Sequence, residues 1–217
     1  MKKLQVGVIG LGKFGFKFGK TLTDMGHEVL GVDTNPEAVR QASDALTQVF
    51  QVDAMDRETL RQMGFADFNY VMISVGESIT ASAMIALRLK EMGLRQVWAK
   101  AVGPDHARLL EKIGVDRVFV PEAMAAKQLA RQMVDPDFIE YLPFAQHVGI
   151  KELTVNRWSG RTLRDLNLTN RFKTQVVARK KMGEASYSFI PPADEHLDRG
   201  DTLVVIGHMD QLEKLEP

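Results

Sequence analysis

The sequence has no cysteine, no excess of either charge and no long apolar run. Without cysteine, the chain has no disulfide, no thiolate nucleophile and no cysteine-based zinc site. Lys and Arg total 28, as do Asp and Glu; since chains that bind DNA phosphate through charge are usually basic, we expect no nucleic-acid partner. No stretch of about 18 apolar residues occurs that could span a membrane, and the apolar run 4–9 is too short for a signal peptide. We therefore expect a cytoplasmic protein without direct membrane insertion, linked to a membrane only through a partner.

Short apolar runs alternate with helical patterns over the first two thirds of the chain. Runs of a few residues rich in Val, Ile or Phe are typical of buried parallel strands. The six runs predicted as strands are 4–9, 28–32, 48–52, 70–74, 96–100 and 117–120. Pro36, Pro104 and Pro121 stand where intervening or following helices would begin. This alternation predicts an α/β fold, a Rossmann domain with a doubly wound parallel sheet.

The pattern changes near residue 135. The sequence Asp135-Pro136-Asp137 ends the helix that is predicted to begin at Pro121. Beyond it, strands are predicted at 147–155, 174–180, 186–190 and 202–207, with helices at 163–168 and 209–215. We therefore predict a Rossmann domain at residues 1–135 and a small α+β domain at residues 136–217.

A glycine-rich turn directly follows the first predicted strand. Its residues are Gly10, Leu11, Gly12, Lys13, Phe14 and Gly15, with the spacing G-x-G-x-x-G. In such a turn the first glycine permits a tight bend, the second lets a pyrophosphate approach the backbone, and the third lets the helix pack on the strand. Free N–H groups at the start of the helix then face the anion. The turn favours a nucleotide site, and a purely structural turn is the alternative.

Asp33 ends the second predicted strand, 18 residues after Gly15. An acid at this place accepts hydrogen bonds from the ribose hydroxyls and repels a 2′-phosphate, which argues against NADP. Because strand, turn, helix, second strand and acid follow in the expected order, we predict an adenine nucleotide as the ligand. Thr34 and Asn35, directly after the acid, are included in the predicted site.

Further candidates lie at the carboxyl ends of later strands, where ligands of open α/β sheets bind. They are Asp53, Ala54, Ser74, Val75, Gly76, Lys100 and Glu122. Asp53 and Ser74 are expected near the adenosine. Lys100 needs an anionic partner, either a phosphate or a local carboxylate. Glu122 is either an acid in the first helical turn or a ligand of a divalent cation, and Lys13 is either a partner of the terminal phosphate or a solvated lysine.

Catalytic patterns are missing from the sequence. The five histidines are not paired at metal-ligand spacing, and no nucleophile motif such as G-x-S-x-G occurs. A Rossmann dehydrogenase needs a proton donor near the nicotinamide, and residues 136–217 contain no compact cluster for that role. We therefore expect a nucleotide sensor rather than an enzyme, with an NAD-dependent oxidoreductase as the alternative.

Several motifs resemble the TrkA/KtrA family, the cytosolic regulatory subunits of bacterial potassium uptake systems, and most closely its KtrA branch. The resemblance covers essentially the whole chain. The motifs are VIGLGKFG (8–15), MGHEVLGVD (25–33), WAKA (98–101), LEKIGVDR (110–117), GRTL (160–163), LNL (166–168) and RGD (199–201). The resemblance implies an N-terminal RCK (KTN) domain followed by a C-terminal RCK domain.

It also implies partners and ligands. Dimers of such chains assemble into an octameric ring beneath a membrane potassium-translocating subunit of the KtrB/TrkH kind. ATP and ADP favour different ring shapes, with ATP activating, and NAD(H) also binds within the family. Gly10, Gly12, Gly15 and Asp33 correspond to nucleotide contacts, and Glu122 to a carboxylate that helps to hold Mg²⁺ or another divalent cation beside the phosphates. A sensor subunit of another cation transporter is the alternative.

Lys13 departs from the family pattern, in which arginine is frequent at this position. Arginine can hold a neighbouring subunit's γ-phosphate with two donors, whereas lysine is a compact point charge. We therefore expect this chain to discriminate ATP from ADP less strongly than relatives that carry arginine.

Overall fold

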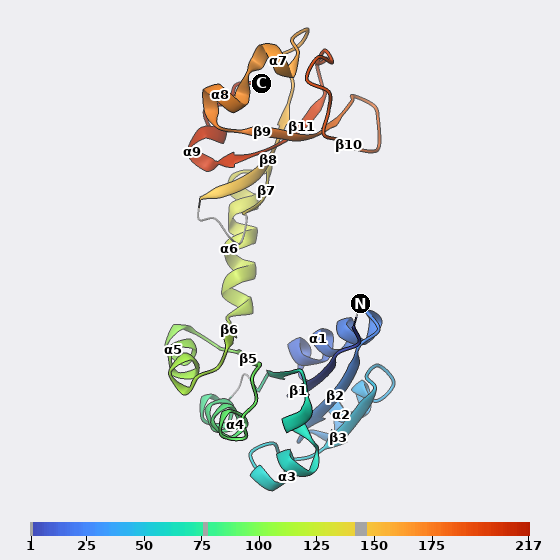
Figure 1. Cartoon of the computed structure of the whole chain (residues 1–217), viewed down its shortest axis with the longest axis vertical. Coiled ribbons are helices and arrows are strands. Elements are labelled where there is room, and N and C mark those ends of the chain that lie inside the picture. Colours follow the sequence, from blue (N-terminus) through green and yellow to red (C-terminus); the bar gives the residue numbers. More distant parts are fainter. Residues whose placement is uncertain (1, 76–77, 142–146) are drawn as a thin grey trace. The chain divides into compact units, whose positions relative to one another are not determined.

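The computed structural model describes residues 2–75, 78–141 and 147–217 (Figure 1). The chain forms two compact units, Met1–Met124 and Ala125–Pro217, which are described here one at a time. The division falls in the first turns of α6 (Pro121–Val134). The boundary predicted from the sequence, after residue 135, lies at the other end of the same helix.

The first unit contains a six-stranded parallel sheet with the order β3-β2-β1-β4-β5-β6, the Rossmann order. Its strands are β1 (Gln5–Ile9), β2 (Glu28–Asp33), β3 (Gln48–Gln51), β4 (Tyr70–Ile73), β5 (Val97–Lys100) and β6 (Arg117–Phe119). All six lie where the sequence predicted them. Ile9 pairs with Val32 on one side and Ile73 on the other, so the three central strands end level at their carboxyl ends.

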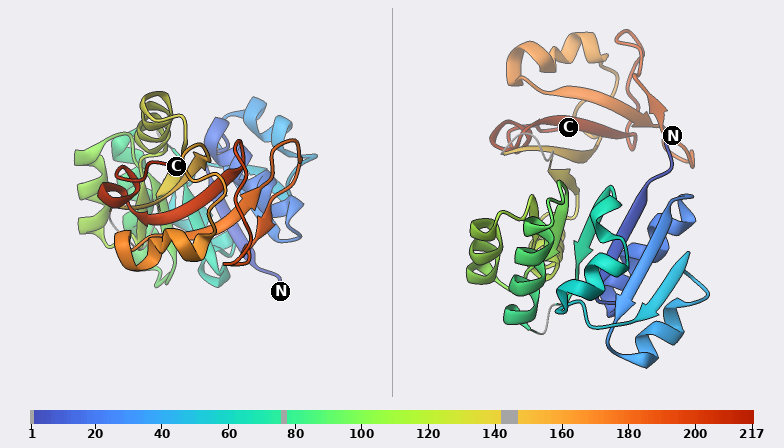
Figure 2. Two further views of the ribbon diagram at one scale, coloured as in Figure 1. Left: turned by 90° about the horizontal axis from the view of Figure 1, so that it is seen from above. Right: turned by 60° about the horizontal axis from the view of Figure 1, so that its bottom comes forward.

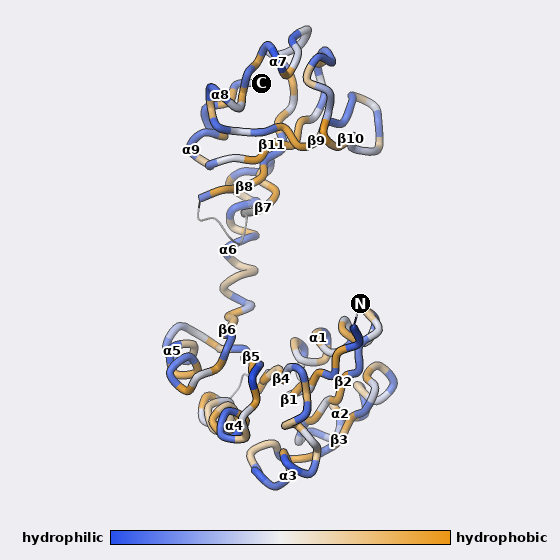
Figure 3. Tube along the Cα trace, viewed as in Figure 1, coloured by the Kyte–Doolittle hydropathy of each residue, from blue (hydrophilic) through white to orange (hydrophobic). Residues whose placement is uncertain are grey.

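Helices cover both faces of this sheet (Figure 2). They are α1 (Lys13–Asp24), α2 (Pro36–Ala42), α3 (Arg57–Gln62), α4 (Ile79–Glu91), α5 (Pro104–Ile113) and the 3-10 helix η1 (Phe65–Asp67). Alternate strand residues serve opposite faces: Ile73 and Ala99 pack in the core with α4 and α5, whereas Val8 and Met72 pack with α1 and α2. Because both faces are covered, the central strands are apolar over most of their length (Figure 3).

The second unit contains a five-stranded antiparallel sheet with the order β10-β9-β11-β8-β7. Its elements are β7 (Phe138–Tyr141), β8 (Val148–Thr154), α7 (Leu163–Leu166), α8 (Leu168–Phe172), β9 (Gln175–Lys180), β10 (Ser188–Phe189), β11 (Thr202–His208) and α9 (Met209–Leu212). Leucines of all three helices pack with Leu203 and Val205 in one core. The predicted small α+β domain is thus present.

The structure corrects three local predictions in this unit. The predicted helix 163–168 is two short helices, because Asn167 adopts the left-handed conformation (φ 48°, ψ 42°) that asparagine tolerates better than most residues. The predicted strand 186–190 pairs only over Ser188–Phe189. Strand β7 was not predicted, since its four residues show no clear alternation.

Within the ranges that the structure describes, no helix has the length and apolar character needed to cross a bilayer.

Candidate functional site

The three glycines of the turn meet different surroundings. Gly10 has φ +94°, and a Cβ there would lie 2.8 Å from the carbonyl oxygen of Ser74. A Cβ on Gly15 would lie 1.9 Å from the carbonyl oxygen of Gly10. A Cβ on Gly12 would meet no atom within 4 Å. Gly10 and Gly15 therefore serve the internal packing of the turn, while Gly12 leaves space through which a ligand can reach the backbone.

The start of α1 is arranged to receive an anion. Gly12 is the N-cap residue and has no side chain that could bond to the first N–H groups, and the first turn contains no acid. Lys13 is exposed and makes no hydrogen bond or ion pair with any residue that the structure describes. The unsatisfied amides, the helix dipole and this lysine all favour negative charge at this place.

The side chains of Leu11 and Phe14 pack against other parts of the protein. Leu11 is 3% exposed and belongs to the core under α1. The Phe14 ring is half-buried and stacks on Phe18, with centroids 6.2 Å apart. Both residues were predicted to contact the nucleotide, and this stays a prediction; the N–H of Leu11 already donates a hydrogen bond to Asp33.

Asp33 binds the glycine turn directly. Its Oδ2 accepts a hydrogen bond from the N–H of Leu11 at 2.6 Å, and its Oδ1 accepts one from the N–H of Asn35 at 2.8 Å. A carboxylate offers about four lone-pair sites, so about two remain for ribose hydroxyls. The acid thus holds the turn in place at the spot where the ribose is expected, and this structural role is one that spacing alone did not indicate.

Hydrogen bonds join the carboxyl ends of four strands around this acid. Gly10 N donates to the carbonyl of Val32 at 2.9 Å, and Ser74 N to that of Ile9 at 2.7 Å. Val52 N donates to the carbonyl of Asp33 at 3.1 Å. Ser74 is therefore beside the glycine turn, and its predicted place near the adenosine stays a prediction.

The other predicted contacts at these strand ends differ in accessibility. Asp53 is exposed, and its Oδ1 accepts a hydrogen bond from Met55 N at 2.8 Å. Ala54 is 5% exposed and belongs to the core. Thr34 and Asn35 are exposed, Val75 is half-buried, and Gly76 lies outside the described residues.

Lys100 and Glu122 form an ion pair, with 2.6 Å between Nζ and Oε1. The Lys100 ammonium also lies 5.9 Å from the centre of the Phe14 ring. Its hydrogen bond and charge hold the pKa of Glu122 below its usual range. Of the two partners considered for Lys100, the structure contains the carboxylate.

No group of three or more metal-ligating side chains occurs among the described residues. Glu122 is consequently a single carboxylate, and a cation held there would need further ligands such as phosphate oxygens and water.

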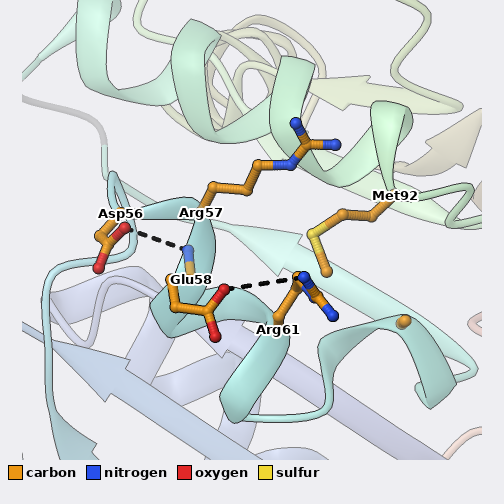
Figure 4. Close-up of a pocket in the computed structure, with 6 residues that line it drawn as sticks. Asp56, Arg57, Glu58, Arg61 and Met92 are labelled. Carbon is orange, nitrogen blue, oxygen red and sulfur yellow. Dashed lines mark hydrogen bonds and ion pairs between the residues drawn. The ribbon is translucent and has the colours of Figure 1, made fainter.

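A separate hollow lies away from the glycine turn, against α3, η1 and the end of α4 (Figure 4). Its charged side chains interact with neighbouring groups: Asp56 caps α3 by accepting from Glu58 N at 3.1 Å, and Arg61 lies 3.8 Å from Glu58. None of the predicted nucleotide contacts lines it.

Family models and related proteins match this chain over most of its length. The family model of the TrkA-N domain matches residues 6–121, and that of the TrkA-C domain matches residues 151–217. The chain is 33% identical over 217 residues to the Ktr system potassium uptake protein A of Bacillus subtilis (strain 168), covering 100% of this chain and 97% of that protein. It is 35% identical over 209 residues to the protein of the same name from Vibrio alginolyticus, covering 96% and 94%.

Solved structures show the same fold. The crystal structure of the GsuK RCK domain has a TM-score of 0.63 and 18% identity to this chain, covering 99% of it. This chain spans 47% of the length of that one.

Proposed function

The chain belongs to the TrkA/KtrA family, with a TrkA-N domain followed by a TrkA-C domain, and on this premise we propose that it is the nucleotide-sensing regulatory subunit of a potassium transporter. It binds ATP and ADP, and also NAD(H), in the first unit. It acts at the cytoplasmic face of the membrane on a potassium-translocating subunit.

The arrangement of the glycine turn carries this proposal. Gly12 leaves the backbone accessible, α1 presents free amides, and Asp33 fixes the turn while retaining acceptor sites for a ribose. These features lie at the carboxyl ends of β1 and β2, where Rossmann domains bind nucleotides. Asp33 would repel a 2′-phosphate, which favours adenine nucleotides and NAD(H) over NADP(H).

Cations near the turn are suited to the terminal phosphates. We assign this role to Lys13, which is exposed at the start of α1, and to Lys100, whose ammonium lies beside Phe14. Glu122 supplies one ligand to Mg²⁺ or another divalent cation that also bridges phosphate oxygens, which suits the preference of this ion for phosphates and few carboxylates.

Regulation follows from a difference in affinity between two shapes of the assembly. We propose that dimers form an octameric ring, and that the shape which binds ATP more tightly than ADP is populated when ATP is bound. Coupling of this kind typically amounts to about 1–3 kcal/mol. The ring transmits the change to the membrane subunit, so the protein regulates transport and catalyses no reaction.

Calorimetry and an uptake assay test the proposal. Purified protein should bind ATP and ADP at one site per chain, and should co-purify with a potassium-translocating subunit encoded in the same cell. Deletion of the gene that encodes this chain should lower nucleotide-dependent potassium uptake by that cell. Failure to bind any adenine nucleotide would refute the proposal, and steady turnover of NADH with a carbonyl substrate would favour an oxidoreductase.

A further inference from the structure

The ion pair between Lys100 and Glu122 has two unequal members. The side chain of Lys100 is 17% exposed, whereas that of Glu122 is 68% exposed. The lysine is thus largely enclosed by the protein, and the carboxylate reaches it from the first turn of α6 while remaining in contact with water. An exposed carboxylate can leave such a pair without itself becoming buried.

The direction of Lys100 follows from the alternation along β5. Val97 and Ala99 are fully buried in the core shared with α4 and α5. Trp98, between them, packs with the core on the α1 side, and Lys100 has the same parity as Trp98. The Lys100 ammonium accordingly lies 5.9 Å from the ring of Phe14, in the first turn of α1.

The first turn of α1 and Lys100 therefore both contribute positive charge beside Phe14. The first turn of α1 supplies the positive end of the helix dipole and unbonded amides, and Lys100 supplies a full charge next to it. Among the residues that the structure describes, Glu122 is the carboxylate within ion-pair distance of Lys100.

We propose that Glu122 competes with the terminal phosphate of the nucleotide for Lys100, so that phosphate binding breaks the Lys100–Glu122 pair and releases the first turn of α6 from β5. The inference rests on the proposed nucleotide site and adds an internal contact that opposes binding. The phosphate prevails because it carries more charge than one carboxylate and also reaches the α1 amides.

The exchange links the nucleotide to α6. With the pair intact, Glu122 ties the start of α6 to the end of β5; with phosphate on Lys100, Glu122 is free in solvent, where a divalent cation can use it. Nucleotide binding thus removes the ion pair that ties the first turn of α6 to β5.

Titration calorimetry of the full-length chain with ATP and with ADP, in EDTA, tests this competition. EDTA removes divalent cations, so Glu122 acts only on Lys100. Glu122→Gln preserves shape and removes the charge; because exposed ion pairs are weak, ATP should bind about two- to fivefold more tightly. Glu91→Gln is the matched control, since Glu91 is half exposed and lies 3.9 Å from Arg57; its affinity should equal that of the unsubstituted chain.

Lys100→Met, alone and together with Glu122→Gln, completes a double-mutant cycle for the two residues. This variant should bind ATP at least about tenfold more weakly, and adding Glu122→Gln to it should give no further gain, because the carboxylate then has no lysine to occupy. Circular dichroism checks that each variant is folded, and the comparison of Glu122→Gln with Glu91→Gln stands even if Lys100→Met does not fold.

Three results would overturn the inference. The first is that Glu122→Gln binds ATP in EDTA no more tightly than the unsubstituted chain. The second is that Glu91→Gln increases ATP affinity as much as Glu122→Gln does. The third is that Glu122→Gln still increases ATP affinity when Lys100 is replaced by methionine. If the unsubstituted chain binds no adenine nucleotide, the proposed function and the competition both fail. If it binds nucleotide and Glu122→Gln gives no gain, the competition alone fails.

Discussion

Replacing Gly15 by alanine would place a methyl group against the backbone of the glycine turn. The new Cβ would lie 1.9 Å from the carbonyl oxygen of Gly10 and 3.1 Å from the Cβ of Ser74, whereas real Cβ atoms essentially never approach another atom more closely than 3.0 Å. The turn and α1 must therefore separate by at least about 1.1 Å in a close-packed interior. The obstructing atom is a backbone oxygen, which cannot rotate away as the end of a flexible side chain can.

The expected loss of stability follows from three contributions. Overpacking of this kind lowers the free energy of unfolding by about 1–3 kcal/mol. The hydrogen bonds from Gly10 to Val32 and from Leu11 to Asp33 are strained or lost, at about 1 kcal/mol each. Alanine in a helix returns about 1 kcal/mol relative to glycine. The sum is a net loss of about 2–4 kcal/mol in the first unit, together with loss of nucleotide binding.

Gly12→Ala is the matched control. Its Cβ meets nothing within 4 Å, and φ at Gly12 is −63°, which alanine adopts freely. The free energy of unfolding should therefore stay the same or rise by up to about 1 kcal/mol. The methyl group nevertheless occupies the approach of the pyrophosphate, so ATP affinity should fall at least about tenfold.

Denaturant unfolding separates the two effects. In a Trp158→Phe background, Trp98 is the remaining tryptophan and reports on the first unit. The Gly15→Ala midpoint should fall and that of Gly12→Ala should not, while calorimetry shows weak ATP binding by both. Equal midpoints for the two variants would refute the steric argument, and full ATP affinity in Gly12→Ala would show that the phosphate does not pass this residue.

Three further predictions concern other parts of the chain. Lys13→Ala should weaken ATP binding by about two- to tenfold more than ADP binding in calorimetry; an unchanged ratio would remove Lys13 from the phosphate site. Arg179→Met leaves the buried carboxylate of Asp201 without its counter-ion and should lower the unfolding free energy of the second unit by about 3–5 kcal/mol, as followed by Trp158 fluorescence; a loss below about 1 kcal/mol would contradict this. Tyr187 donates a hydrogen bond to Glu152, which raises the pKa of Tyr187 to about 12; ultraviolet titration should show a late tyrosine that Glu152→Gln returns toward its ordinary value, and no change would refute the contact.

The raised pKa of Tyr187 also makes the free energy of unfolding depend on pH. The folded protein holds the Tyr187 proton more tightly than the unfolded chain does, since the folded pKa is raised from 10.0 to about 12. The stabilisation is therefore fully present below about pH 10 and is lost as the pH rises towards 12. A stability profile that is flat over this range would contradict the sign.

The sequence predicted the parallel sheet well because burial on both faces leaves a strong local pattern. The runs at β1, β2 and β4 are continuous and apolar, and the glycines and Asp33 have a spacing that few other structures require. The second unit was harder to predict from its sequence, because short edge elements carry little pattern. Strand β7 has only four residues. The break between α7 and α8 depends on the left-handed conformation of Asn167, which the neighbouring residues do not predict.

Contacts between distant segments could not be derived in the same way. The sequence placed Lys100 at a strand end and left phosphate and carboxylate open as partners. Only the folded arrangement brings Glu122, 22 residues later, to 2.6 Å from it. The hydrogen bond from Leu11 to Asp33 likewise depends on the exact path of the glycine turn.

The proposed site assigns the binding of a nucleotide and the discrimination between ATP and ADP to different groups. In the proposed function, the amides of α1 and the Asp33 carboxylate would contact the first phosphates and the ribose, which ATP and ADP share. Contacts that are equal for both ligands cannot shift an equilibrium between two shapes, however tight they are. Discrimination must then come from groups that meet the terminal phosphate, and the described cations placed for this are Lys13 and Lys100. Since Lys100 is paired with Glu122 at the start of α6, we expect Lys100 to be the cation whose binding to the terminal phosphate also acts on that helix.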